Sequence, residues 1–111
     1  MSNWEQLIFY AEKISDKSEF KSSRSEFLYG MALKELGDLQ NAEKHLRQID
    51  QPYSNYEERY QLGQFLAGID KKEDAKQILS EIISESNYMT KHNRTLYRNV
   101  VRDAKKLIET L

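Results

Sequence analysis

The residues of this chain best suited to chemistry form a row of basic side chains near the C-terminus. Arg94, Arg98 and Arg102 follow one another at intervals of four residues, and Lys105 extends the row. Residues spaced by four lie one turn apart on the same face of a helix. Guanidinium groups in that arrangement could bind an acidic peptide, phosphate groups or an anionic membrane surface.

The basic row coincides with an uneven distribution of charge along the chain. Residues 1–90 contain eleven basic and sixteen acidic side chains, whereas residues 91–111 contain six and two. The simpler interpretation, which the sequence favours, is a solvated face whose arginines pair with carboxylates such as Glu81 or Glu85. Each exposed pair would contribute only about 0–1 kcal/mol. Nucleic acid is not an expected partner, because the net charge is −1, and neither is a membrane surface.

No catalytic or metal-binding pattern is present elsewhere in the sequence. His45 and His92 lie among polar residues and lack a second histidine four residues away, so both are expected to face solvent. The chain has no cysteine, no glycine-rich phosphate loop and no nucleophile elbow. We therefore expect a protein that is not an enzyme and that needs no cofactor or metal.

Length and composition favour a small helical protein. A chain of 111 residues supports one hydrophobic core, and four glycines and one proline favour long helices over a sheet with many tight turns. No stretch approaches the ~20 apolar residues that span a bilayer, and the N-terminus lacks the features of a signal peptide. These observations predict a soluble, cytoplasmic, all-α protein with a single domain.

Apolar residues at helical spacing predict about six helices, and the basic row lies on the last of them. The predicted bounds are near residues 3–16, 22–36, 39–50, 54–68, 71–85 and 90–110. Capping boxes are expected at four starts, and their residue pairs are Ser2 with Glu5, Ser23 with Glu26, Ser54 with Glu57, and Asp70 with Glu73. Asp38 is expected to cap the helix after Gly37. The apolar face of the last helix, from Leu96 to Leu111, is expected to pack on the preceding helix pair.

The stretch from residue 27 to residue 49 recurs once, 33 residues later. A fixed period in the 30s indicates stacked structural repeats. The matched pairs are Tyr29 and Leu62, Gly30 and Gly63, Leu33 and Leu66, Ala42 and Ala75, Leu46 and Leu79, and Ile49 and Ile82. The small residues would let two helix backbones approach closely. A side chain added at Gly63 is therefore expected to clash, at a cost of about 1–3 kcal/mol.

These matched positions resemble the tetratricopeptide repeat (TPR), a unit of ~34 residues that forms two antiparallel helices. The resemblance implies a right-handed array of antiparallel helix pairs, a TPR-like α-solenoid of about six helices in one domain, residues 1–111. Its parts would be an N-terminal half-repeat (1–21), a first repeat (22–52), a second repeat (53–88) and a C-terminal capping helix (89–111). The sequence departs from the family at Asp70, which replaces a turn glycine that nearby Gly68 could compensate. It also departs at Glu26 and Arg59, which replace a tryptophan.

The resemblance also implies a concave groove, lined by the first helix of each repeat, that would suit an extended or helical peptide. Carried over residue by residue, the lining positions are Arg24, Phe27, Met31 and Lys34 in the first repeat, and Glu57, Tyr60, Gln64 and Ala67 in the second. We therefore expect an adaptor that binds a protein or peptide in this groove. Three alternatives remain: the groove aromatics and Met31 only pack against the first and last helices, the protein is a structural homodimer, or it binds anions through the basic row.

Overall fold

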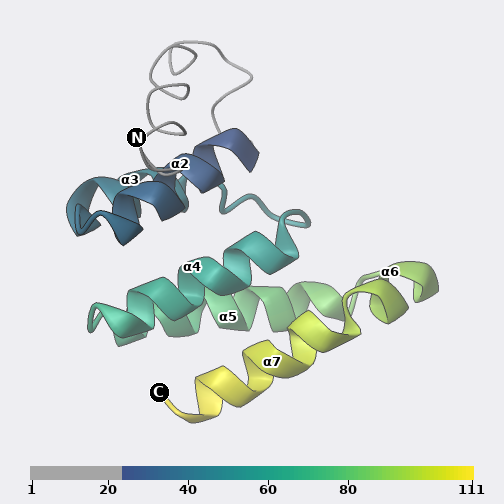
Figure 1. The fold of residues 1–111 in the computed structure, drawn as a ribbon. Coiled ribbons are helices and arrows are strands. Elements are labelled where there is room, and N and C mark those ends of the chain that lie inside the picture. Colours follow the sequence, from purple (N-terminus) through teal and green to yellow (C-terminus); the bar gives the residue numbers. More distant parts are fainter. Residues whose placement is uncertain (1–23) are drawn as a thin grey trace. The chain divides into compact units, whose positions relative to one another are not determined.

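The computed structural model describes residues 24–111, which form six α-helices and, within that range, no strand (Figure 1). The helices are α2 (Arg24–Glu35), α3 (Leu39–Arg47), α4 (Tyr56–Gly68), α5 (Lys72–Ser86), α6 (Lys91–Leu96) and α7 (Arg98–Glu109). The all-α prediction is confirmed. The helix predicted at residues 3–16 and the caps predicted at Ser2 and Ser23 lie outside the described residues. The chain divides into two compact units, residues 1–51 and residues 52–111.

In the first unit, α2 packs against α3 through a close approach at Gly30. A Cβ atom at Gly30 would lie 2.8 Å from Leu46 Cγ and 3.3 Å from the Leu46 backbone nitrogen. Ala42 and Leu46 are fully buried on the facing side of α3. Asp38 is the N-cap of α3, and its side chain accepts a hydrogen bond from the Asn41 N–H at 3.4 Å, as the sequence predicts.

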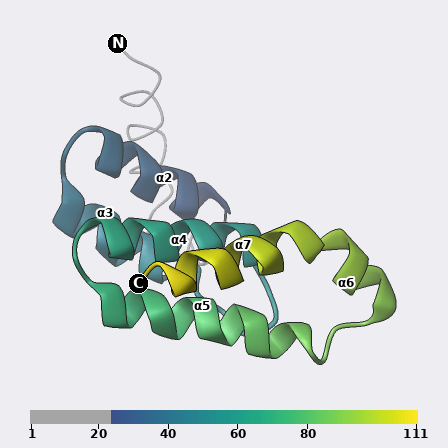
Figure 2. The ribbon, with the colours of Figure 1, turned by 90° about the horizontal axis from the view of Figure 1, so that it is seen from below.

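In the second unit, α4 packs against α5 in the same manner, and α7 covers the pair (Figure 2). A Cβ atom at Gly63 would lie 3.0 Å from Leu79 Cδ2, so the predicted close approach is present. The third helix, α7, packs mainly on α5 and less extensively on α4. Ala104 is fully buried in this contact. The second unit is therefore a three-helix bundle with α6 at one end.

The turns that join α2 to α3 and α4 to α5 have matching backbone hydrogen bonds 33 residues apart. In the first turn the N–H groups of Gly37 and Asp38 donate to carbonyls three and five residues earlier, at 3.0 and 2.9 Å. In the second, the N–H groups of Asp70 and Lys71 donate in the same way, at 3.3 and 2.8 Å. Both turns need a left-handed residue, with φ of +86° at Gly37 and +67° at Asp70. The expectation that Gly68 relaxes the second turn is wrong, because Gly68 is the last residue of α4.

Two of the predicted capping boxes are also wrong. The N-cap of α5 is Lys71, because Asp70 occupies the left-handed turn position before it. The N-cap of α4 is Asn55, one residue after Ser54, with φ of +53° and no hydrogen bond from its side chain to the helix. Short polar residues such as aspartate and asparagine can either cap a helix or adopt a turn conformation. At Asp70 and Asn55 the residue has the left-handed backbone of a turn and its side chain does not cap the helix.

Asp70→Gly is expected to raise the free energy of unfolding by about 0.5–1 kcal/mol. Glycine adopts the left-handed region without steric cost, and the gain is limited because glycine is also more flexible in the unfolded chain. The opposite exchange at the matching position, Gly37→Asp, is expected to lower stability by a similar amount. Urea denaturation of both variants measures the two effects. Equal stability of Asp70→Gly and the unmodified protein would show that the aspartate is unstrained.

The predicted C-terminal helix at residues 90–110 is in fact two helices, α6 and α7, that meet at Tyr97. Tyr97 leaves helical geometry, with φ of −102° and ψ of 12°, and its ring lies 4.9 Å from the ring of Tyr56. Helix α6 has no buried residue, and Leu96 is 60% exposed rather than part of the apolar face. The chain changes direction there because only α7 has an apolar face to bury.

Candidate functional site

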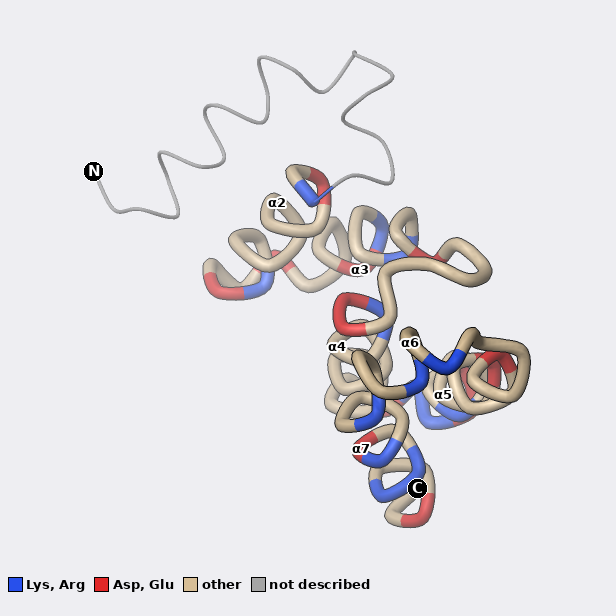
Figure 3. Tube along the Cα trace, turned by 90° about the vertical axis from the view of Figure 1, so that its right-hand side faces the viewer, with Lys and Arg blue, Asp and Glu red and all other residues tan. Residues whose placement is uncertain are grey.

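A pocket of about 410 Å³ opens between the C-terminal end of α5 and the helices α6 and α7. Its lining, which we call the basic pocket, consists of Ser86, Asn87, Met89, Arg94, Arg98, Val101, Arg102 and Lys105. All four residues of the predicted basic row therefore line one pocket, and none of its lining residues is acidic. Figure 3 shows the lysine and arginine positions that follow one another along α6 and α7.

Two helices position the charged groups of the basic pocket. Arg94 comes from α6, whereas Arg98 begins α7 and Arg102 follows one turn later. Arg94, which lies on the other side of Tyr97, lines the same pocket as the α7 residues. Met89, in the loop after α5, adds an apolar contribution to the wall.

The cationic side chains of the basic pocket make few contacts with other groups of the protein. Arg94 Nη2 donates to the backbone oxygen of Asn87 at 3.0 Å, which fixes the guanidinium group against a neutral acceptor. Arg102 contacts the carboxylate of Asp103 at 3.4 Å, a long distance for an exposed pair of sequence neighbours. The side chains of Arg98 and Lys105 make no hydrogen bond or ion pair with any residue in the described range. Much of the positive charge of the pocket is therefore not neutralised by the residues of that range.

Arg94, Arg98, Arg102 and Lys105 are all exposed, as the simpler interpretation of a solvated face expects. The pairing with Glu81 or Glu85 that this interpretation also expects is wrong. Arg59 of α4 binds both carboxylates. Its Nη1 and Nη2 atoms donate to Oε1 and Oε2 of Glu85 at 2.9 and 2.8 Å, and its Nη2 lies 3.7 Å from Glu81. Since these carboxylates already have a partner, they do not neutralise the basic pocket.

The Arg59–Glu85 pair is the main polar interaction in the interior of the second unit. Arg59 is fully buried and Glu85 is 9% exposed. The Tyr53 N–H also donates to Glu85 Oε1, at 2.5 Å, and Arg59 Nη1 donates to the Ser54 carbonyl at 3.3 Å. These bonds tie the loop before α4 to the last turn of α5. They therefore hold in place the helix end that supplies one wall of the basic pocket.

The pair also shifts the titration of two groups. Burial alone would raise the pKa of Glu85, but hydrogen bonds from Arg59 and Tyr53, with the charge of Arg59, hold this pKa below its ordinary value. Burial and the nearby charge of Glu85 raise the pKa of Tyr56, whose ring lies 5.6 Å from the Arg59 guanidinium carbon. Glu85 therefore stays ionised at neutral pH, and Tyr56 stays neutral.

A second polar pair lies in the first unit. His45 Nδ1 and Glu26 Oε2 are 3.0 Å apart, and the side chains are 21% and 4% exposed. The prediction that His45 faces solvent is therefore wrong, because the ring contacts Glu26 and lies 4.6 Å from the Tyr29 ring. His92 is exposed, as predicted.

The polar pairs occupy equivalent places, since Glu26 and Arg59 are 33 residues apart. Both are ionisable residues, both are buried, and each contacts a polar side chain from the second helix of its pair. These contacts were not predicted from the sequence. The available signal was a charged residue at the position where the TPR pattern has tryptophan.

The residues of the predicted concave groove differ widely in exposure. Phe27 is 4% exposed, so its ring offers no surface to a partner. Tyr60 is half-buried, and burial with the charge of Asp103 on α7 raises its pKa, so this ring packs toward the last helix. Packing of Phe27 against the helix predicted at residues 3–16 lies outside the described residues. Met31 and Lys34 are half-buried as well, whereas Arg24, Glu57 and Gln64 are exposed. The predicted groove residues belong to both units, and the structure brings together Gln64 and Tyr60, whose Nε2 and OH atoms are 3.3 Å apart.

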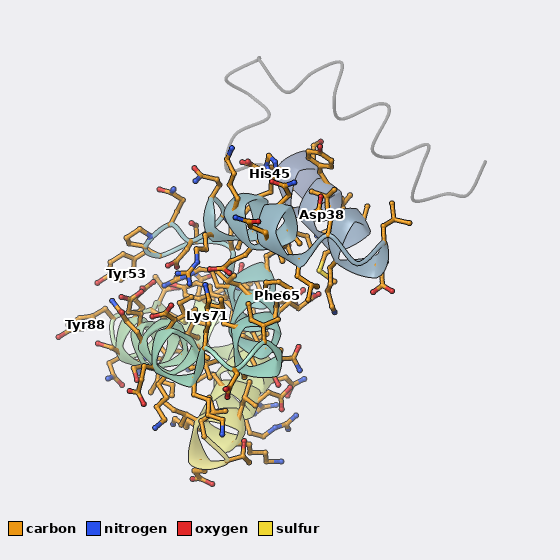
Figure 4. All side chains as sticks on the ribbon, turned by 90° about the vertical axis from the view of Figure 1, so that its left-hand side faces the viewer. Asp38, His45, Tyr53, Phe65, Lys71 and Tyr88 are labelled. Carbon is orange, nitrogen blue, oxygen red and sulfur yellow. The ribbon has the colours of Figure 1, made fainter. Side chains whose placement is uncertain are left out.

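Two tyrosines of the second unit are strongly exposed, and one of them is next to the basic pocket in the chain. Tyr88, between the lining residues Asn87 and Met89, is 76% exposed, and Tyr53 is 62% exposed. Both rings point outward on the same side of the second unit (Figure 4). Their backbones are linked through Glu85, whose carboxylate accepts from Tyr53 and whose carbonyl accepts from Tyr88.

Other kinds of site are not found in the part of the chain that the structure describes. Within residues 24–111, no helix is long and apolar enough to cross a membrane. In the same range, no three histidine or carboxylate side chains are grouped so that they could hold a metal ion. Comparison with protein families, curated proteins and solved structures finds no match to this chain.

Proposed function

We propose that this protein is a non-enzymatic, TPR-like interaction module that binds an acidic segment of a partner protein in the basic pocket. The TPR-like part of the proposal is supported by two helix pairs whose turns share backbone hydrogen bonds at a spacing of 33 residues. It is also supported by the close approach of the two helices of each pair at Gly30 and at Gly63, which occupy equivalent positions. Helix-pair repeats commonly serve as binding surfaces for other proteins.

The observation that carries the binding proposal is the charge of the basic pocket. Four cationic side chains line about 410 Å³ without a carboxylate among them. Like charges held close together repel one another, and an acidic ligand would relieve that repulsion while gaining ion pairs. Because Arg98 and Lys105 have no internal partner in the described range, a ligand would not have to displace an existing salt bridge at either position.

The neighbouring residues favour a protein segment as the ligand. Tyrosine, methionine and arginine are enriched at protein interfaces, and Tyr88, Met89 and Arg94 follow closely along the chain at this place. Met89 and Val101 offer apolar surface to a side chain that accompanies the acidic groups. The proposed site is therefore the basic pocket instead of the concave groove, where Phe27 is buried.

Reversing two charges tests this function. Arg98→Glu with Arg102→Glu is expected to weaken binding of a fluorescent peptide of alternating glutamate and apolar residues by about 10–100-fold, at about 1 kcal/mol or more for each lost contact. Fluorescence anisotropy at low ionic strength measures the affinity, which should fall as salt is added.

The matched control is Lys106→Glu, which changes an exposed cation of the same helix that does not line the pocket. It should weaken binding by less than about threefold, through long-range charge alone. Circular dichroism and thermal melting should be unchanged in all of these variants, since the side chains are exposed. Equal losses in the control and the double variant would mean that the peptide responds to overall charge and not to the pocket.

A further inference from the structure

We infer that the group for which the basic pocket is suited is a phosphoryl dianion, carried on a phosphorylated side chain of the bound acidic segment. This inference rests on the proposed function and narrows the chemistry of its ligand. It depends on three features of the pocket: the kind of cation, the concentration of charge, and the surrounding wall.

The cations are mainly arginines in a regular array. Arg94, Arg98 and Arg102 lie at intervals of four residues, and all of them line the same pocket. A guanidinium group presents several N–H donors in a planar fork, which matches two oxygens of a phosphate at once. A lysine ammonium acts as a point charge and has no such preference. Clusters of arginines are accordingly a common solution for binding phosphorylated peptides.

The pocket is lined by more positive charges than a single carboxylate would neutralise. A phosphorylated serine or threonine carries about −1.5 to −2 charges at neutral pH and three acceptor oxygens at one point. Four cations without a carboxylate among the lining residues can match such a group. Arg94 is already oriented by the Asn87 carbonyl at 3.0 Å, and this bond to a neutral oxygen leaves its charge intact.

The wall of the pocket adds apolar contact. Met89 and Val101 are half-buried and line the pocket together with the arginines, so they offer apolar surface to the carbon atoms of a bound side chain. Asn87 also lines the pocket. The Ser86 hydroxyl donates to the Ile83 carbonyl at 2.5 Å, so it is not assigned to the ligand. A recess of this kind suits a single side chain better than it suits a flat lipid surface.

Three peptides that differ only at a central residue test the inference. The surrounding sequence is acidic, and the centre is phosphoserine, glutamate or serine. We expect the phosphoserine peptide to bind about tenfold or more tightly than the glutamate peptide. Its advantage should shrink as pH falls from about 7.5 to 5.5, because the second pKa of the phosphate is near 6. The pocket lining contains no histidine or carboxylate that would titrate with it.

Charge-conserving variants separate guanidinium geometry from charge. Arg98→Lys with Arg102→Lys is expected to remove most of the preference for phosphoserine over glutamate while retaining binding of the glutamate peptide. Lys106→Arg, outside the pocket, should change neither affinity and serves as the control. Retention of the full preference in the double lysine variant would overturn the role of the arginine forks.

The outcomes distinguish this inference from the proposed function. Equal affinity for the phosphoserine and glutamate peptides, with both lost in Arg98→Glu/Arg102→Glu, would overturn the phosphoryl inference and leave the acidic-segment proposal intact. Absence of binding to all three peptides would overturn both. Binding to vesicles of phosphatidylserine and phosphatidylcholine without peptide binding would also overturn both and would assign the pocket to a membrane surface.

Discussion

Glu85→Ala is expected to lower the free energy of unfolding by about 3–5 kcal/mol, the loss typical when one partner of a buried ion pair is removed. The variant leaves the fully buried Arg59 without its bidentate acceptor. It also removes the acceptor of the Tyr53 N–H. Since domains of this size are stabilised by only about 5–15 kcal/mol, the loss amounts to a large part of the total. Urea denaturation followed by circular dichroism measures it.

Glu81→Gln is the matched control on the same helix. Its carboxylate lies 3.7 Å from Arg59 and its side chain is 44% exposed, so we expect a loss of at most about 1 kcal/mol. Replacing both members of the buried pair by leucine should recover much of the stability lost in Glu85→Ala, because no charge is then left unpaired in the interior. Similar losses of unfolding free energy in the Glu81 and Glu85 variants would show that the buried Arg59–Glu85 pair stabilises the protein no more than the exposed contact does.

The same pair predicts a pH dependence of stability. The pKa of Glu85 is lower in the folded protein than its ordinary value of 4.5. The stabilisation is therefore fully present above the unfolded pKa and is lost as pH falls below about 4.5 through the folded pKa. Melting curves between about pH 6 and 3 should show this loss in the unmodified protein. Glu85→Gln, which starts from a lower stability, should show a smaller decrease over the same range.

The second large effect is expected for Gly30→Ala, which should lower stability by about 1–3 kcal/mol through overpacking. The new methyl group would lie 2.8 Å from Cγ of Leu46, a side chain that is fully buried, and 3.3 Å from the backbone nitrogen of that residue. The helices α2 and α3 would have to separate to admit it. This cost is expected to exceed the gain of about 1 kcal/mol that alanine brings within a helix.

Gly68→Ala provides the comparison, because no atom lies within 4 Å of the position that its new methyl group would take, and its φ is not in the left-handed region. It should raise stability through helix propensity, by less than the roughly 1 kcal/mol found in a helix interior, because Gly68 is the last residue of α4. Gly63→Ala should fall between the two, since its contacts begin at 3.0 Å and are all with the Leu79 side chain. A Gly30→Ala protein as stable as Gly68→Ala would mean that the helix pair adjusts without cost.

The sequence was sufficient to predict much of the fold, because the determining features are local or periodic. Apolar spacing predicts the helices, and the recurrence of Gly30 at Gly63 predicts their close approaches. The left-handed Asp70 could not be predicted as readily, since aspartate is also a common cap residue. The break at Tyr97 is not evident from the sequence because apolar residues continue through it, and its contact with Tyr56 joins residues that are distant in sequence.

For the candidate site, spacing predicted the members of the basic row but not their partners. Arg94, Arg98 and Arg102 could be placed on one face from their sequence intervals. Whether carboxylates neutralise these arginines depends on tertiary packing. In the structure, Glu81 and Glu85 form ion pairs with Arg59 instead. The burial of Phe27 likewise depends on what packs around α2, which no local pattern specifies.

The short helix α6 has a consequence for local stability. It has six residues, none of them buried, so its amide hydrogens should exchange with solvent through local opening well before those of α5 or α7. Arg94 reaches the pocket from this helix and is held there by the Asn87 carbonyl. A ligand that engages Arg94 should therefore slow exchange across α6, at the cost of ordering that segment. Hydrogen exchange would report occupation of the pocket without a label on either molecule.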